Sequence, residues 1–210
     1  MFRTATILAA PVALAVLGIS PALAATAQAA TAVAADPAAG TVRSLQSGLL
    51  AIMRAGSTAG QAGRARAIAP VIDRSFDIPM MTRLAVGPSW TSISAADQAS
   101  LVAAFRALTV AQHAKNFDSY GGEQFVLAPQ VETRGADKLV RTTLTGPGGT
   151  NEALHYRLRQ SGGQWKIIDV YYRNAISQLA TRRADFARVL TRGGAPALIQ
   201  HLNRLAARPE

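Results

Sequence analysis

The side chains able to carry out chemistry are few in this 210-residue sequence, and they are widely spaced. The chain contains no cysteine, which rules out a thiol nucleophile and a thiolate metal site. The spacings typical of hydrolases, zinc proteases and phosphate loops (G-x-S-x-G, S-x-x-K, H-E-x-x-H and G-x-x-x-x-G-K) do not occur. The three histidines, His113, His155 and His201, are not at ligand spacing from one another. We therefore predict a protein that is not an enzyme and has no cofactor or metal.

Paired carboxylates are another source of chemistry, because one can act as an acid and the other as a base. Asp73 and Asp77 are the most closely spaced acidic residues, but Asp77 fits the N-cap of a helix. Asp169 is the one acid in an otherwise apolar segment. For it, a hydrogen bond or an arginine salt bridge is favoured over catalysis. A secreted hydrolase is therefore our last-ranked hypothesis.

The N-terminus has the features of an export signal: Arg3, an apolar run over residues 7–19, then small residues. We predict a signal peptide over residues 1–24, with cleavage as late as residue 29. The apolar run is too short for a bilayer core of roughly 30 Å, although an uncleaved leader acting as an anchor is the alternative. Residues 25–36 are predicted to be a flexible Ala/Thr-rich tether, and residues 37–208 a single domain.

The chain is strongly basic, with 22 Lys+Arg against 12 Asp+Glu and a formal net charge of +10. Such a charge favours anionic partners, which include membrane surfaces, nucleic acid and acidic proteins. Because we expect export, transient contact with a membrane surface is the favoured interpretation. The basic residues are spread along the chain without the aromatic-plus-basic pattern of RNA-binding strands, so we predict no nucleic-acid partner.

Helical periodicity dominates the first half of the chain. Apolar residues recur at helical spacing over residues 37–53, and a glycine-rich segment separates them from a short basic helix over residues 64–73. A further helix is predicted to begin after Asp77. The clearest helix starts at Ser94, which resembles a capping box with Asp97.

From residue 123 the apolar period changes to two, which indicates strands separated by glycine-rich turns. The predicted strands cover residues 123–129, 138–146, 151–160 and 165–172. Helical patterns then resume over residues 176–190 and 195–206. We therefore predict an α+β fold with N-terminal helices, an antiparallel meander of about four strands, and C-terminal helices packed on the sheet.

The last predicted strand, residues 165–172, is apolar on both faces, which is unusual in a small antiparallel sheet. Simple alternation places on one face Trp165, Ile167 and Tyr171, and on the other Ile168, Val170 and Tyr172. The C-terminal helices could cover the second face in a three-layer core. Alternatively, sheet and helices part around an apolar cavity that holds a ligand. The sequence leaves both hypotheses open, the packed core and the ligand-holding cavity.

Arg183 lies on the apolar side of its predicted helix, in step with Leu179 and Phe186. An arginine is costly there unless it reaches water or meets an anion. It either snorkels or pairs with Asp169 or Asp185, or it binds a lipid phosphate at the mouth of a cavity. We place Arg183 at the cavity mouth.

Four motifs occur in order along the chain: FDIPMMTRLAVGPSW (76–90), FDSYGGE (117–123), YRLRQSGGQWKIIDV (156–170), and RRADFARVL with GGAPALIQHL (182–202). In this order they resemble the MlaC, or toluene-tolerance auxiliary, family of periplasmic phospholipid-binding ABC transport components. One departure is Arg182, which stands where the family usually has a tyrosine.

The resemblance implies a periplasmic carrier that shields phospholipid acyl chains in an apolar cavity. It also implies partners: an inner-membrane ABC transporter complex with its substrate-binding subunit, and an outer-membrane lipoprotein/porin complex. Lipid shuttled between them would maintain membrane lipid asymmetry. A hopanoid-associated carrier of the same family and a ligand-free periplasmic adaptor are the alternatives.

The residues expected to line the cavity are apolar positions of the predicted helices and strands. They are Phe76, Met80, Met81, Leu84, Phe105, Leu108, Phe117, Tyr156, Trp165, Ile168, Val170, Tyr172, Ile176, Leu179, Phe186 and Leu190.

Overall fold

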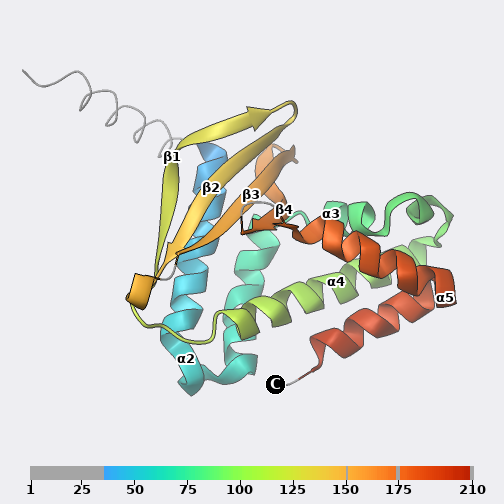
Figure 1. Ribbon diagram of the computed structural model, residues 1–210. Coiled ribbons are helices and arrows are strands. Elements are labelled where there is room, and N and C mark those ends of the chain that lie inside the picture. Colours follow the sequence, from blue (N-terminus) through green and yellow to red (C-terminus); the bar gives the residue numbers. More distant parts are fainter. Residues whose placement is uncertain (1–35, 150, 174–175, 209–210) are drawn as a thin grey trace, which may run out of the picture.

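The computed structural model describes residues 36–149, 151–173 and 176–208 (Figure 1). The predicted signal peptide and nearly all of the predicted tether lie outside these residues. The helices are α2 (Pro37–Ser75), α3 (Ile78–Val86), α4 (Ala95–Asn116) and α5 (Gln178–Ala206), with short 3-10 helices η1 (Gly87–Ser92) and η2 (Pro147–Gly149). Within the described residues, every helix is too short or too polar to cross a membrane.

The strands form one antiparallel sheet in the order β1-β2-β3-β4-β5. They are β1 (Gln124–Arg134), β2 (Asp137–Thr145), β3 (Asn151–Ser161), β4 (Gln164–Tyr172) and β5 (Ile176–Ser177). This arrangement confirms the α+β prediction and the meander, and it adds the two-residue strand β5. Ile176, which we expected on the apolar face of a helix, belongs to β5 and is 50% exposed.

Helix α2 bends back on itself at the predicted glycine-rich segment (Figure 1). Gly56 and Gly60 have φ angles of 53° and 59°, a backbone region that side chains other than glycine rarely adopt. The two halves pack closely, because a Cβ on Gly48 would lie 2.9 Å from a methyl of Val71. Helix α5 has a similar break at Gly194, where φ is 64°, between the two helices that we predicted.

Asp36, which we assigned to the end of the tether, belongs to the folded part of the chain. Its carboxylate accepts a hydrogen bond from the Ala38 amide at 2.8 Å and so caps α2. It also accepts one from Lys138 Nζ at 2.6 Å, which joins the helix to β2. These two bonds move the boundary of the fold one residue towards the N-terminus.

A β-bulge in β4 changes the faces that alternation predicted. Leu158 pairs with Ile167 and Arg157 with Asp169, so Ile168 is an extra residue. Beyond the bulge, Val170 continues on the face of Ile167, where simple alternation had placed them on opposite faces. Our separation of Ile167 from Val170 and Tyr172 was therefore wrong.

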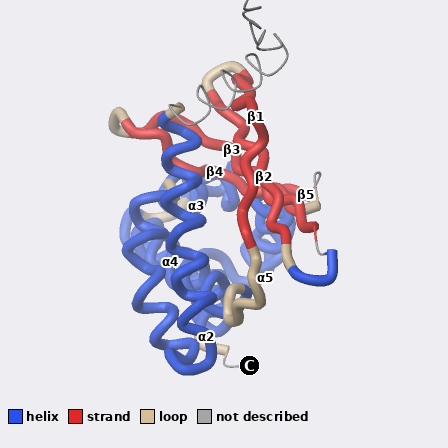
Figure 2. Tube along the Cα trace, turned by 90° about the vertical axis from the view of Figure 1, so that its left-hand side faces the viewer, coloured by secondary structure: helices blue, strands red, loops and turns tan. Residues whose placement is uncertain are grey.

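The helices gather on one side of the sheet (Figures 1 and 2). Helix α2 contacts β1, β2 and β4, while α4 packs between α2 and α5. Leu158 is fully buried in this core, whereas its neighbours Arg157 and Arg159 bind the buried carboxylate of Asp137 on the opposite face. The predicted alternation of β3 is thereby confirmed, and its apolar face points towards the helices.

Candidate functional site

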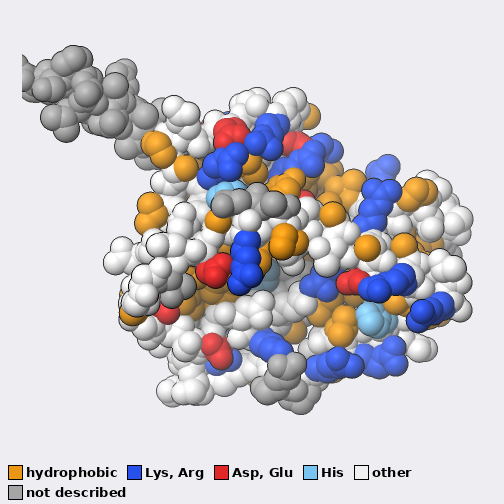
Figure 3. Space-filling model, in the orientation of Figure 1, with side chains coloured by type: hydrophobic (Ala, Val, Ile, Leu, Met, Phe, Trp, Pro, Cys, Tyr) orange, Lys and Arg blue, Asp and Glu red, His pale blue; other side chains and the backbone are white. Residues whose placement is uncertain are grey.

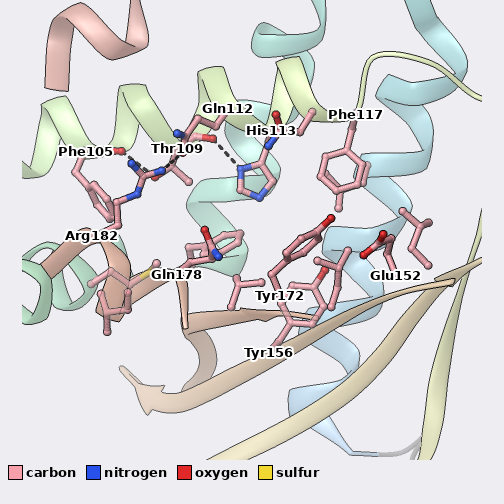
Figure 4. Close-up of a pocket in the computed structure, with 18 residues that line it drawn as sticks. Phe105, Thr109, Gln112, His113, Phe117, Glu152, Tyr156, Tyr172, Gln178 and Arg182 are labelled. Carbon is pink, nitrogen blue, oxygen red and sulfur yellow. Dashed lines mark hydrogen bonds between the residues drawn. The ribbon is translucent and has the colours of Figure 1, made fainter. Parts of the chain in front are cut away.

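A cavity of about 550 Å³ lies where β3 and β4 meet α4 and the start of α5 (Figure 4). Apolar and aromatic side chains form most of its wall, and polar groups stand at a few positions. The lining residues are Leu49, Phe76, Met81, Phe105, Thr109, Gln112, His113, Asn116, Phe117, Leu144, Glu152, Leu154, Tyr156, Val170, Tyr172, Gln178, Leu179 and Arg182. Its volume and lining are typical of small-molecule sites, which span about 300–1,000 Å³.

One face of α4 forms the helical wall of the cavity. The helix is capped at Ser94, whose hydroxyl accepts from the Asp97 amide at 3.1 Å, as the sequence predicted. From Phe105 the lining positions recur three or four residues apart, through Thr109 to Gln112 and beyond, which is the spacing of one helix face. This wall is apolar at Phe105 and becomes more polar towards the end of the helix.

The sheet contributes residues two apart on neighbouring strands. Leu154 pairs with Tyr172 and Tyr156 with Val170 across β3 and β4, and all four line the cavity. Because alternate residues of a strand share a face, these pairs present one continuous apolar surface. That surface belongs to the strand whose cover the sequence left open.

Asp169 positions the start of α5 against this surface. Its carboxylate accepts from the Ser177 hydroxyl at 2.6 Å and from the amides of Leu179 and Val170 at 3.0 and 2.8 Å. Leu179 lines the cavity. The buried acid in β4 therefore makes the hydrogen bonds that we favoured over catalysis.

His113 stands in the middle of the wall, between two aromatic rings. It packs edge-on against Phe76 at 5.5 Å between ring centroids and stacks on Phe117 at 6.2 Å. Burial lowers the pKa of His113, although a hydrogen bond at 2.7 Å between Nδ1 and the Thr109 carbonyl opposes this shift. The carbonyl only accepts, so Nδ1 carries the hydrogen, and the neutral ring leaves the middle of the cavity uncharged.

Burial favours the neutral form of Tyr156 too, and for a phenol this means that its pKa is raised. A hydrogen bond to Gln46 partly offsets that rise. The phenol stays protonated at any physiological pH, so it too adds no charge to the wall.

Arg182 brings a permanent positive charge to the cavity. It is half-buried, and its Nη2 donates to Gln112 Oε1 at 2.5 Å. Burial lowers the pKa of Arg182, and the charge of Asp185 acts in the opposite direction. An arginine nevertheless remains protonated at neutral pH.

Half of the residues that we expected to line the cavity do so: Phe76, Met81, Phe105, Phe117, Tyr156, Val170, Tyr172 and Leu179. Buried in the core are Leu108, Ile168 and Phe186, with Met80 packed beside them. Also away from this cavity are Leu84, Trp165, Ile176 and Leu190. The contacts of any of these residues with lipid stay a prediction.

Arg183 does not line this cavity. It is exposed, and its guanidinium lies against Gly87 beside a surface cleft between η1 and α5. Arg182, one position earlier, lines the cavity instead. The helical spacing fits both positions, because each is three or four residues from Leu179 and Phe186.

Sequence reasoning missed the polar part of the lining. These residues are Thr109, Gln112, His113, Asn116, Glu152, Gln178 and Arg182. The α4 members could have been found, because they share the helix face of Phe105. Glu152, Gln178 and Arg182 could not, because their place in the lining depends on how β3 and α5 approach α4.

Within the described ranges no three acidic or histidine side chains are grouped as a metal site requires. The fold and the largely apolar cavity define an α+β protein with a candidate site for an apolar ligand. A family model described as "MlaC protein" matches residues 43–204, most of the sequence. The chain belongs to the MlaC family, which confirms the resemblance of the four motifs.

A solved structure with a similar fold is the phospholipid-binding protein from Ralstonia solanacearum in complex with a phospholipid. The TM-score is 0.69 and the identity 23%, over 82% of this chain and 98% of that chain. A search of curated proteins gave no match.

Proposed function

We propose that this protein is a periplasmic carrier that holds lipid acyl chains in the cavity between the sheet, α4 and α5. The observation that carries the proposal is the apolar surface of the paired residues Leu154, Tyr156, Val170 and Tyr172, which lines a cavity. Membership of the MlaC family and the phospholipid bound to a protein of the same fold support it.

Energetics explain why such a carrier needs no catalytic group. Exposing one acyl chain of about 16 carbons to water costs roughly 12 kcal/mol, at roughly 0.8 kcal/mol per methylene. A soluble protein that covers the chain removes most of this barrier. The neutral His113 and Tyr156 suit the task, because a charged wall would disfavour hydrocarbon.

The proposal includes transfer of lipid between an outer-membrane lipoprotein/porin complex and an inner-membrane ABC transporter with its substrate-binding subunit. Lysine and arginine side chains are spread over the face shown in Figure 3. Such a surface favours transient docking on anionic membranes or acidic partners. Transfer of labelled lipid from the loaded protein to the reconstituted transporter would test this step.

The first test is native mass spectrometry of the exported protein, followed by solvent extraction and lipid analysis of the same sample. We expect about one phospholipid per protein. Substitution Leu154→Trp should fill the cavity and remove most of the bound lipid. Val126→Trp, at a position that is 52% exposed on β1, should leave the bound lipid unchanged.

Two other outcomes would change the conclusion. A bound hopanoid would keep the cavity and replace the cargo. Protein that stays at its bare mass after exposure to lipid vesicles would overturn the carrier and favour the ligand-free adaptor.

A further inference from the structure

The charges around the cavity are distributed unevenly. Among the described lining residues, Arg182 is the only lysine or arginine and Glu152 the only acid. They lie at opposite ends of the group in Figure 4, with His113 and Tyr172 between them. Glu152 has a cationic partner, because its carboxylate lies 3.7 Å from Arg173 Nε. An anion is therefore favoured beside Arg182.

No carboxylate of the described residues forms a salt bridge with Arg182. Asp185, whose charge acts on it, forms an ion pair with Arg188. The Asp169 carboxylate is occupied by Ser177 and by backbone amides. A half-buried guanidinium without a carboxylate partner is costly, and that cost falls when an anion binds.

Gln112 holds this guanidinium in place. One of its five N–H donors binds Gln112 Oε1, which leaves donors for a second acceptor. The arginine fork matches the geometry of phosphate and binds it through paired hydrogen bonds.

We propose that Arg182 binds the phosphate group of the cavity's ligand at the α4–α5 end, with Gln112 as the residue that positions it. The inference rests on the proposed carrier function and deepens it, because it names the residues that hold the phosphate of the lipid head. The same chemistry would also accept a free phosphate monoester, and the experiment separates the two sources.

The experiment equilibrates the full exported protein with phosphatidylcholine vesicles that contain dioleoylphosphatidylglycerol and dioleoylglycerol in equal amounts. Native mass spectrometry then gives the ratio of the two bound lipids, whose acyl chains are identical. We expect the wild-type protein to prefer the phosphate-bearing lipid, and Arg182→Gln to reduce that preference about tenfold, the effect of losing a charged hydrogen bond. Arg182→Lys should retain part of it.

Arg183→Gln is the matched control, because it removes the same charge from the next position of α5, outside the cavity. Its lipid ratio should equal that of the wild-type protein. An unchanged ratio in Arg182→Gln, or an equal reduction in Arg183→Gln, would overturn the inference while leaving the carrier intact.

A second experiment tests whether a free phosphate monoester binds at the same place. The protein is titrated with glycerol 3-phosphate, and the side-chain amide signal of Gln112 is monitored in NMR spectra. A shift that disappears in Arg182→Gln would assign the site to a free phosphate monoester as well as to a lipid head. Failure of the wild-type protein to retain any lipid would overturn the carrier proposal. If the wild-type protein retains no lipid and glycerol 3-phosphate also leaves the Gln112 signal unshifted, the Arg182 site is overturned as well.

Discussion

Arg64, in the second half of α2, donates a hydrogen bond from Nε to the carbonyl oxygen of Ala114 at 2.8 Å. Its Nη1 donates to the carbonyl of Gly56 at 2.7 Å, at the bend of α2. Ala114 lies in the last turn of α4, where carbonyls have no partner within the helix. One buried arginine thus holds the bend of α2 against the end of the helix that forms the cavity wall.

Replacing this arginine should destabilise the fold. We expect Arg64→Met to lower the free energy of unfolding by about 1–3 kcal/mol, because buried carbonyls lose their donors. Chemical denaturation would measure the change. Arg66→Met, at an exposed position two residues later, is the control and should have little effect. Equal stability of both variants would contradict a structural role for Arg64.

Two glycines of α2 should respond to alanine in opposite directions. A Cβ at Gly48 would lie 2.9 Å from Val71, so Gly48→Ala should cost about 1–3 kcal/mol through overpacking. At Gly40 the nearest atom is 3.9 Å away, so Gly40→Ala should gain about 0.5–1 kcal/mol from helix propensity. Thermal unfolding of the pair checks the sign. A stabilised Gly48→Ala would mean that the two halves of α2 pack less closely.

His113 should make the protein less stable in mild acid. Burial lowers its pKa in the folded state, so the unfolded chain, with the ordinary value of 6.5, takes up the proton first. This contribution to stability is complete above pH 6.5 and is lost as the pH falls from there through the folded-state pKa.

The measurement is the melting temperature at about pH 7.5 and about pH 5.5. The wild-type protein should melt at a lower temperature in acid, and His113→Gln should show a smaller difference. The carboxyls of Asp36, Asp73 and Asp137 have pKa values lowered from 3.8, so they titrate below this window. An unchanged pH dependence in the variant would exclude His113 as its source.

Asp169 should be required for the start of α5. Asp169→Ala removes the acceptor for Ser177 and for two backbone amides, so we expect a loss of about 1–3 kcal/mol in unfolding free energy. Lipid retention should fall as well, because Leu179 lines the cavity. Asp185→Ala, which breaks the partly exposed ion pair with Arg188 and leaves the Asp169 hydrogen bonds in place, is the control for the free energy of unfolding. Equal effects of the two substitutions would contradict this role.

The secondary structure was largely predictable from the sequence because its signals are local. The bend of α2 follows from Gly56 and Gly60, which supply backbone angles that other residues avoid. Ser94 and Asp97 marked the start of α4, and the period of two marked the strands. The four motifs indicated the family for a related reason. Each is a short segment that is recognised from its own residue types, so no tertiary contact has to be known.

The site depended on tertiary structure at the points where local patterns are ambiguous. Positions 182 and 183 fit the apolar stripe of α5 equally well, and only the approach of α5 to Gln112 and Gly87 placed one in the cavity and the other outside. Because of the bulge at Ile168, Val170 lies on the same face as Ile167, whereas simple alternation places the two on opposite faces. The sequence could not show this, because the register is set by pairing with β3.

The sequence by itself determined an α+β fold. It also showed that the strand over residues 165–172 is apolar on both faces, whereas a strand of a small antiparallel sheet usually has one polar face. Whether the apolar surface packs or lines a cavity depends on the distance between β3, β4 and α4, to which residues far apart in the chain contribute. Periodicity records only which side of an element is apolar. The tertiary structure therefore decided that Tyr156 and Tyr172 line a cavity, whereas Leu108 and Phe186 do not.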